Sequence, residues 1–259
     1  GDEFASLYNS GGIWGLFEVS GSVEAYAYAY FEAFWIEWWS AELFSFTLLE
    51  FGPEGTVDTL PEYTLAEVDG DTLYLNMGSR AELRGEEGAD GSEDETFTLT
   101  GSGAGTVQVG YAGVLTTYIG VNQIVGDGAG GDDRIETENL YNALIFDGGA
   151  GNDYIEGSLV GDTLTGGSDD DTIYGFAGDD TISGGLGADI LYGGTAEDIL
   201  YGYAAKTAGD DNAADRMYGE ENNDVIHGGG GNDYADGGAG DDSISGHGGS
   251  DELLGGDDQ

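Results

Sequence analysis

The chain has 259 residues, of which 51 are glycine, 52 are acidic and 5 are basic, and its formal net charge is −47. Phosphate groups repel so negative a chain, which argues against a nucleic-acid partner or an anionic membrane surface. The sequence contains no cysteine, which excludes disulfides, thiolate metal sites and a cysteine nucleophile.

Residues 1–120 form an aromatic-rich region whose patterns predict β-strands. Residues 22–36 alternate small residues with tyrosine and phenylalanine, a period of two that is typical of a strand. A second strand is expected at 43–51, followed by a proline-containing loop. Shorter strands are expected at 72–76, 95–100, 106–110, 116–121 and 142–146. We expect an all-β region, with metal-free solenoid coils as one arrangement, in which the aromatic side chains pack a core rather than bind sugars or subunits.

From about Val121 onward the glycine content rises and a nine-residue period begins. One unit reads GGAGNDYIE from Gly148, and GAGGDDRIE from Gly128 is an outlying copy. Aspartate occupies the sixth place of the units: Asp133, Asp153, Asp162, Asp171, Asp180, Asp189, Asp198, Asp215, Asp224, Asp233, Asp242 and Asp251. The eighth place is apolar, as in Ile155, Leu164 and Ile173.

The period is interrupted near residues 202–209, where the sequence GYAAKTAG matches the units poorly. We interpret this segment as a surface loop that replaces the far half of one coil. The last unit is incomplete at Gln259, and no secretory signal is visible at Gly1, so we expect a piece of a longer protein.

The period predicts a parallel β-roll, that is, a β-solenoid. Residues seven to nine of each unit are β-prone and residues one to six form a glycine-rich turn, so two units make one coil of eighteen residues. The eighth side chains then face inward as ladders of isoleucine and leucine, and each coil is stabilised by its neighbours. We therefore divide the chain into residues 1–120 and a roll at residues 121–259.

Eighteen residues per coil places Asp153, Asp171 and Asp189 in one column and Asp162, Asp180 and Asp198 in another. Neighbouring carboxylates in a column would lie about 5 Å apart and repel each other by roughly 1 kcal/mol in water, and more near a protein. Five basic residues cannot supply the counter-charge. Oxygen ligands on flexible turns suit Ca²⁺ better than softer metals or Mg²⁺.

The second and fourth residues of each turn are expected to offer backbone carbonyls on the side of the sixth residue. Gly149 and Gly151 with Asp153, and Gly167 and Asp169 with Asp171, would then supply six oxygens to one ion. The other predicted carbonyl donors are Gly178, Gly185, Gly187, Gly194, Asn222, Gly229, Gly231, Gly238, Gly240 and Gly249. Aspartates eighteen residues apart form seven pairs, 153/171, 162/180, 171/189, 180/198, 215/233, 224/242 and 233/251, which predicts several ions at about seven interior sites.

These units resemble the hemolysin-type calcium-binding repeat of the RTX (repeats-in-toxin) family over about residues 126–259. The resemblance implies a parallel β-roll with calcium in its turns, in a secreted bacterial protein that stays unfolded in low cytosolic calcium and folds outside the cell. Several units depart from the pattern at the second or fourth place, where Phe176, His247, Val160, Asp169, Ala196 and Ala213 replace glycine. Backbone carbonyl donation is expected to survive these replacements.

No catalytic motif is present: the sequence has neither HExxH nor GxSxG, and its two histidines lie within the repeats. Glutamates interrupt the most apolar stretch, which argues against membrane insertion. We expect a non-enzymatic calcium-binding structural module of a secreted or cell-surface bacterial protein. The alternatives are a self-assembling surface-layer, filament or adhesin subunit, and the non-catalytic part of a secreted hydrolase or carbohydrate-active enzyme.

Overall fold

The computed structural model describes residues 49–51, 57–59, 64–84, 91–103, 105–203 and 212–256. The strand predicted at 22–36 and most of the one predicted at 43–51 lie outside these residues. Within the predicted proline loop, β2 (Val57–Thr59) pairs antiparallel with β1 (Leu49–Phe51). Among the described segments, none forms a helix with the length and hydropathy of a membrane span.

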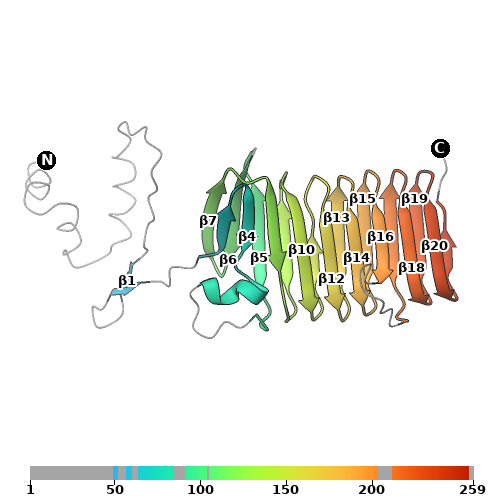
Figure 1. Cartoon of the computed structure of the whole chain (residues 1–259), viewed down its shortest axis with the longest axis horizontal. Helices are drawn as coiled ribbons and strands as arrows, with labels where there is room; N and C mark the ends of the chain where they lie inside the picture. The colour runs from blue at the N-terminus through green and yellow to red at the C-terminus, as the bar shows by residue number, and fades with distance from the viewer. Residues whose placement is uncertain are drawn as a thin grey trace, which may run out of the picture. The chain divides into compact units, whose positions relative to one another are not determined.

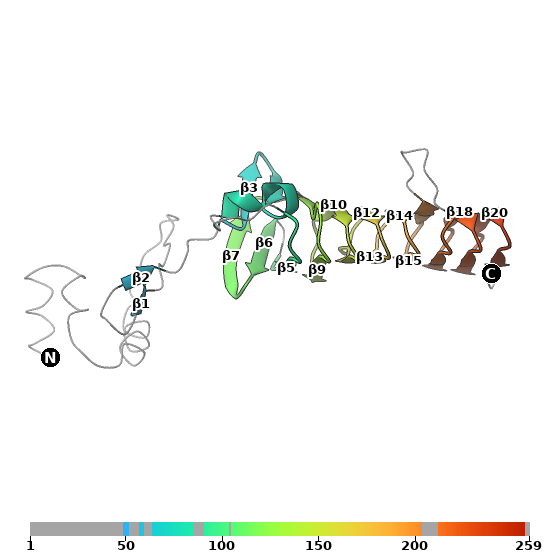
Figure 2. The same cartoon turned by 90° about the horizontal axis from the view of Figure 1, so that it is seen from below.

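The remaining strands form two sheets that lie in two layers, which Figures 1 and 2 show from two directions. In spatial order, the nine-stranded sheet contains β20 (Ser243–Gly249), β18 (Val225–Gly231), β16 (Ile199–Tyr203), β14 (Thr181–Leu186), β12 (Thr163–Ser168), β10 (Ala143–Ala150), β8 (Gln123–Asp127), β4 (Thr72–Leu75) and β3 (Ala66–Asp69). The ten-stranded sheet contains β21 (Glu252–Leu254), β19 (Tyr234–Ala239), β17 (Arg216–Glu221), β15 (Ile190–Thr195), β13 (Thr172–Ala177), β11 (Tyr154–Glu156), β9 (Arg134–Glu138), β5 (Thr96–Gly101), β6 (Thr106–Tyr111) and β7 (Val114–Ile119).

Consecutive strands from β8 to β21 alternate between the two sheets, so the chain winds as a parallel β-solenoid, as the nine-residue period predicts. Each strand pairs in parallel with the strand two further along the chain. The register is eighteen residues over most of the roll, as in Ile155↔Ile173 and Ile173↔Leu191. One coil therefore consists of two units.

The strands are longer and the turns shorter than predicted. β13 begins at the seventh residue of one unit and ends at Ala177, the third residue of the next. Glycines at places one to three thus belong to strands, because their backbone still pairs with the neighbouring coil, as in Gly149↔Gly167. Only places four to six form the turn.

The interior of the roll is a thin apolar layer. The eighth-place residues are 0–1 % exposed from Ile155 to Ala235, with one contributed by each strand. Because each coil contributes only two such residues, the core is stabilised mainly by contacts between neighbouring coils. The core cluster continues upstream through Phe97, Leu99 and Leu73.

The upstream end of the solenoid is built differently. The predicted short strands correspond to β4, β5, β6, β7 and β10, and residues 78–84 form a 3₁₀ helix, η2 (Gly78–Arg84), that the sequence analysis does not anticipate. β3 pairs antiparallel with β4, and β6 pairs antiparallel with both β5 and β7. β4 and β5 pair in parallel with β8 and β9, so strand pairing is continuous across residue 121.

The interruption near residue 202 removes no half-coil, so the interpretation of a replaced half is wrong. β16 remains in the nine-stranded sheet and β17 in the ten-stranded sheet, and Leu191 pairs directly with Met217. This register is twenty-six residues, eight more than a coil. The extra residues lie in the single connection between β16 and β17, and both strands are kept.

A row of tyrosines stacks along the ten-stranded sheet. The ring centroids of Tyr174 and Tyr192 are 4.7 Å apart and those of Tyr192 and Tyr218 are 4.9 Å apart, with interplanar angles of 1° and 10°. The rings face one another, so each ring covers the face of the next.

Candidate metal centre

All fourteen predicted carbonyl donors lie where the backbone takes a left-handed φ. Their φ angles range from +79° at Asp169 to +156° at Gly240. At Gly167 a side chain is also excluded by space, because a Cβ would collide with the carbonyl oxygen of Gly149 one coil earlier. Glycine therefore serves both the conformation and the close stacking of the turns.

Most of the units in which another residue replaces glycine at the second or fourth place keep this turn shape. Asp169, Phe176, Ala196 and His247 adopt φ angles of +79°, +74°, +91° and +60°, although each has a side chain. Val160 and Ala213 are not among the residues of positive φ, so their turns differ from the others. The strain of a left-handed non-glycine residue is tolerated where the coils on either side fix the backbone.

The sixth-place aspartates form two continuous columns. In each column the backbone N–H of one member donates to Oδ1 of the member one coil further along, as Asp153 does to Asp171 (2.8 Å) and Asp171 to Asp189 (2.9 Å). The first column contains Asp133, Asp153, Asp171, Asp189, Asp215, Asp233 and Asp251. The second contains Asp162, Asp180, Asp198, Asp224 and Asp242.

These columns contain ten stacked aspartate pairs in the described residues, whereas the eighteen-residue rule counted seven. The three overlooked pairs are Asp133–Asp153, Asp189–Asp215 and Asp198–Asp224, whose members are 20, 26 and 26 residues apart. The longer separations arise from two extra residues between Asp133 and Asp153 and from the longer β16–β17 connection. Stacking follows strand register, so a rule that uses sequence distance alone missed them.

Glu95 is a further member of the first column that the sequence analysis did not single out. Its N–H donates to Asp133 Oδ1 (2.8 Å), as each aspartate N–H does to the next. The available signal was the spacing of Glu95 and Phe97, which matches that of the sixth and eighth places in the repeat.

The second carboxylate oxygen of these aspartates has a different environment. Oδ2 is buried and accepts no hydrogen bond within the described part of the chain in Asp133, Asp153, Asp171, Asp180, Asp198, Asp224 and Asp242. A Cβ on Gly148, the first residue of its unit, would collide with Asp153 Oδ2, so glycine there leaves room for the oxygen. Buried carboxylate oxygens without a donor are costly, and a cation is the partner that would offset the cost.

Burial also changes the acidity of the columns. Desolvation raises the pKa of Asp171 to about 9, and the neighbouring Asp189 and Asp153 raise it further against the hydrogen bond from Asp153 N–H. Desolvation likewise raises the pKa of Asp133 and Asp180 to about 8 and of Asp153 and Asp198 to about 7. The ionised columns are therefore destabilising unless a cation compensates them.

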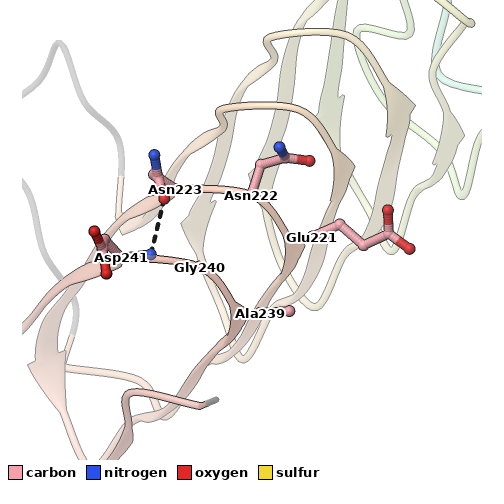
Figure 3. Close-up of a pocket in the computed structure, with 6 residues that line it drawn as sticks. All are labelled: Glu221, Asn222, Asn223, Ala239, Gly240 and Asp241. Carbon is pink, nitrogen blue, oxygen red and sulfur yellow. Dashed lines mark hydrogen bonds between the residues drawn. The ribbon is translucent and has the colours of Figure 1, made fainter. Parts of the chain in front are cut away.

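A second ladder runs along the outside of the turns at place five. Here the side chain accepts the N–H of the residue one coil further along, as Asn152 Oδ1 does from Asp170 (3.1 Å). Figure 3 shows the same bond from Asp241 N–H to Asn223 Oδ1 (2.8 Å) at the edge of a pocket of about 470 Å³. The lining residues Asn222 and Gly240 are two of the predicted carbonyl donors. The outer ladder holds the turns in register without using the column aspartates.

The donor set fits a hard divalent cation. In the described segments no three His, Cys, Asp or Glu side chains are grouped closely enough to hold one ion. Each ion would therefore combine column carboxylates with backbone carbonyls, and such all-oxygen sets suit Ca²⁺.

The comparison with protein families agrees with this chemistry. The model of the RTX calcium-binding nonapeptide repeat (4 copies) matches residues 145–159, 156–191, 183–205, 208–244 and 228–259. No curated protein and no solved structure matches the chain. The matched residues are those that build the two columns from Asp153 onward. With the repeats, the solenoid and the stacked acidic turns in agreement, residues 145–205 and 208–259 are a segment of RTX-type calcium-binding repeats.

Proposed function

We propose that the chain is a non-enzymatic, calcium-binding structural module of a secreted or cell-surface bacterial protein, and that its roll folds when calcium binds outside the cell. The observation that carries this proposal is the buried Oδ2 atoms of Asp133, Asp153, Asp171, Asp180, Asp198, Asp224 and Asp242, which accept no hydrogen bond from any described residue. RTX calcium-binding repeats are typical of secreted bacterial proteins, which supports the extracellular location. The sequence contains no HExxH, GxSxG or cysteine, which supports a structural role.

The proposed ligand sets join neighbouring turns of one column. The carbonyls of Gly149 and Gly151 with Asp153 would hold an ion together with the equivalent oxygens of the turn that ends at Asp171. The left-handed turns and the room left by first-place glycines support these sets. For the whole chain, we propose that residues 121–259 bind calcium and fold with it, and that residues 1–120 do not.

The physical basis of the response is the balance between stacking and repulsion. The apolar layer contributes two buried side chains per coil, and each coil also adds two carboxylates to the columns. Extracellular calcium modules bind with dissociation constants of about 0.1–1 mM, which keeps the sites empty at cytosolic calcium levels. Folding that depends on binding then occurs only where calcium is abundant.

Circular dichroism of the full chain during a calcium titration tests the proposal. Parallel β-structure is expected to appear at about 0.1–1 mM calcium chloride and to be lost when EDTA is added. Magnesium chloride at the same concentration is the control, and it is expected to be much less effective because Mg²⁺ resists dehydration. A roll that is equally folded in EDTA and in calcium would contradict the proposal.

A further inference from the structure

The first carboxylate column ends upstream at Glu95, which repeats the backbone role of an aspartate. Asp133 donates its N–H to Asp153 Oδ1 (2.7 Å), and its carbonyl accepts the N–H of Tyr154 (2.8 Å). Glu95 forms the same two bonds with the next coil: its N–H donates to Asp133 Oδ1 (2.8 Å) and its carbonyl accepts the N–H of Arg134 (2.7 Å). Glu95 is therefore in register with the repeat although it lies outside the repeat sequence.

The carboxylate of Glu95 has partners that Oδ2 of Asp133, Asp153 and Asp171 lacks within the described residues. Oε2 accepts the backbone N–H of Gly78 (2.6 Å), and Oε1 forms an ion pair with Arg84. Both side chains of this pair are only 1 % exposed. Arg84 Nη1 also donates to the carbonyl of Asn76 (2.8 Å), and its guanidinium lies 4.6 Å from the ring centroid of Tyr111. The guanidinium is thus a buried cation that the upstream fold itself holds in place.

The second column is also completed by the chain at its upstream end. Leu144 lies one coil before Asp162 and donates its N–H to Asp162 Oδ1 (2.7 Å), so the column has an apolar residue where a carboxylate would stand. Ser158 donates its N–H to Asp162 Oδ2 (2.5 Å) and its hydroxyl to Oδ1 (2.9 Å). Neither column carries an uncompensated carboxylate into the upstream strands.

We propose that Arg84 takes the place of a metal ion at the first step of the column, and that β3–β7 with η2 form a calcium-independent cap on which the calcium-dependent coils are built. The inference rests on the proposed function, since it assumes that the coils beyond the cap need calcium. The cap presents β4 and β5 as paired templates for β8 and β9. A preformed template lowers the entropic cost of closing the first coil, because the coil pairs with strands that are already ordered.

Hydrogen exchange of the full chain, followed by mass spectrometry, tests the cap in EDTA and in calcium chloride. In EDTA the amides of β5 are expected to be protected while those of β13 and β15 exchange as in an unfolded chain. Arg84→Met is expected to speed exchange in β5 by about 100-fold, because it leaves a buried carboxylate unpaired. Arg80→Met is the matched control: Arg80 is on the same η2 helix, but its pair with Glu67 is exposed, so β5 should change little.

The double variant Arg84→Met/Glu95→Gln separates charge from packing. It removes both charges and is expected to restore most of the β5 protection in EDTA. The proposal is overturned if wild-type β5 exchanges as fast as β13 in EDTA, if Arg84→Met leaves β5 as protected as wild type, or if the double variant is no better than Arg84→Met. Failure of the proposed function is visible separately, as exchange in β13 that calcium does not slow.

Discussion

The two oxygens of the Asp171 carboxylate have opposite requirements. Oδ1 accepts the N–H of Asp153 in the stack, whereas Oδ2 is buried without a donor in the described residues. A proton or a divalent cation on the second oxygen would relieve the desolvation, and in the proposed ligand sets only the cation would also join neighbouring coils. At the residue scale, the stability of the protein would then depend on two competing solutes.

Replacing Asp171 by asparagine should separate these two effects. Asp171→Asn keeps an acceptor for Asp153 N–H and removes a charge, so the calcium-free roll should become more stable. The calcium midpoint should rise by about three- to tenfold, because two turns lose a charged ligand. Circular dichroism titrations measure both effects.

Asp170→Asn is the matched control for that variant. Asp170 is exposed, and its Oδ1 accepts the N–H of Ala188 (2.8 Å) in the outer ladder, a role that Asn152 already fills one coil earlier. Its calcium midpoint should stay within about twofold of wild type. Equal shifts of the calcium midpoint in the two variants would contradict the proposal that Asp171 is a calcium ligand.

The raised pKa values predict an unusual pH dependence without calcium. The ordinary aspartate value is 3.8, whereas the pKa is about 6 for Asp162 and Asp224 and about 9 for Asp171 in the fold. Folding favours the protonated form, so this stabilisation is complete below about pH 4 and is lost as the pH rises through about 6 to 9. In EDTA, the β-sheet signal in circular dichroism should therefore grow on acidification. Light scattering of the same samples excludes aggregation. A β-sheet signal that does not change with pH would contradict this prediction.

With calcium present, the stability of the roll should depend on pH in the opposite direction. Protons compete with calcium for the same carboxylates, so acidification should raise the calcium midpoint. Titrations at two pH values, one near neutral and one near 5, measure this shift. A calcium midpoint that is the same at both would show that the column carboxylates are not ligands.

At the scale of elements, the β16–β17 connection shows which feature of the repeat the fold preserves. Leu191 and Met217 pair directly despite the longer chain between them, and the N–H of Asp189 still reaches Asp215 Oδ1 (3.0 Å). Register is set by the buried apolar residue and the column aspartate, because shifting either by one place would reverse every side chain. The length of the turn is not part of that specification.

Deleting residues 204–211 should therefore leave the roll intact. The deletion restores an eighteen-residue coil, and the six residues that remain from Gly202 to Asp215 supply places one to six of a unit. The calcium midpoint and the melting temperature in calcium should match wild type, which circular dichroism checks. A large loss of stability would show that residues 204–211 support the coils on either side.

Much of the roll could be predicted because its information is local and repeated. The places of Asp153 and Ile155 recur in every unit, so the two sheets, the columns and the core followed from the sequence. The ends of the strands did not, because glycines at places one to three join the strands only through pairing with a neighbouring coil. Arg84 and Glu95 meet through tertiary contacts, which a spacing rule does not contain.

At the scale of the whole molecule, two kinds of repulsion oppose folding: repulsion among the exposed charges, which follows from the net charge of −47, and repulsion among the buried carboxylates of the two columns. Salt distinguishes these contributions: in about 1 M sodium chloride the Debye length is about 3 Å, which screens exposed charges but acts little on buried ones. The column aspartates from Asp153 to Asp233 are at most 5 % exposed.

Sodium chloride at about 1 M in EDTA should therefore fail to fold the roll, whereas calcium chloride below about 1 mM should succeed. Far-ultraviolet circular dichroism of the same sample in the two solutions makes the comparison. A β-spectrum produced by sodium chloride alone would mean that general repulsion, and not the columns, limits folding.

The tyrosine row has a consequence for how such a chain can be lengthened. Tyr174, Tyr192 and Tyr218 all lie on the ten-stranded sheet, although the aspartates and core residues of the two sheets are interchangeable. Inserting a single unit of nine would transfer every later strand to the opposite layer and split this row, whereas inserting two units would leave it whole. Gene duplications that preserve the row must therefore insert whole coils, that is, multiples of eighteen residues.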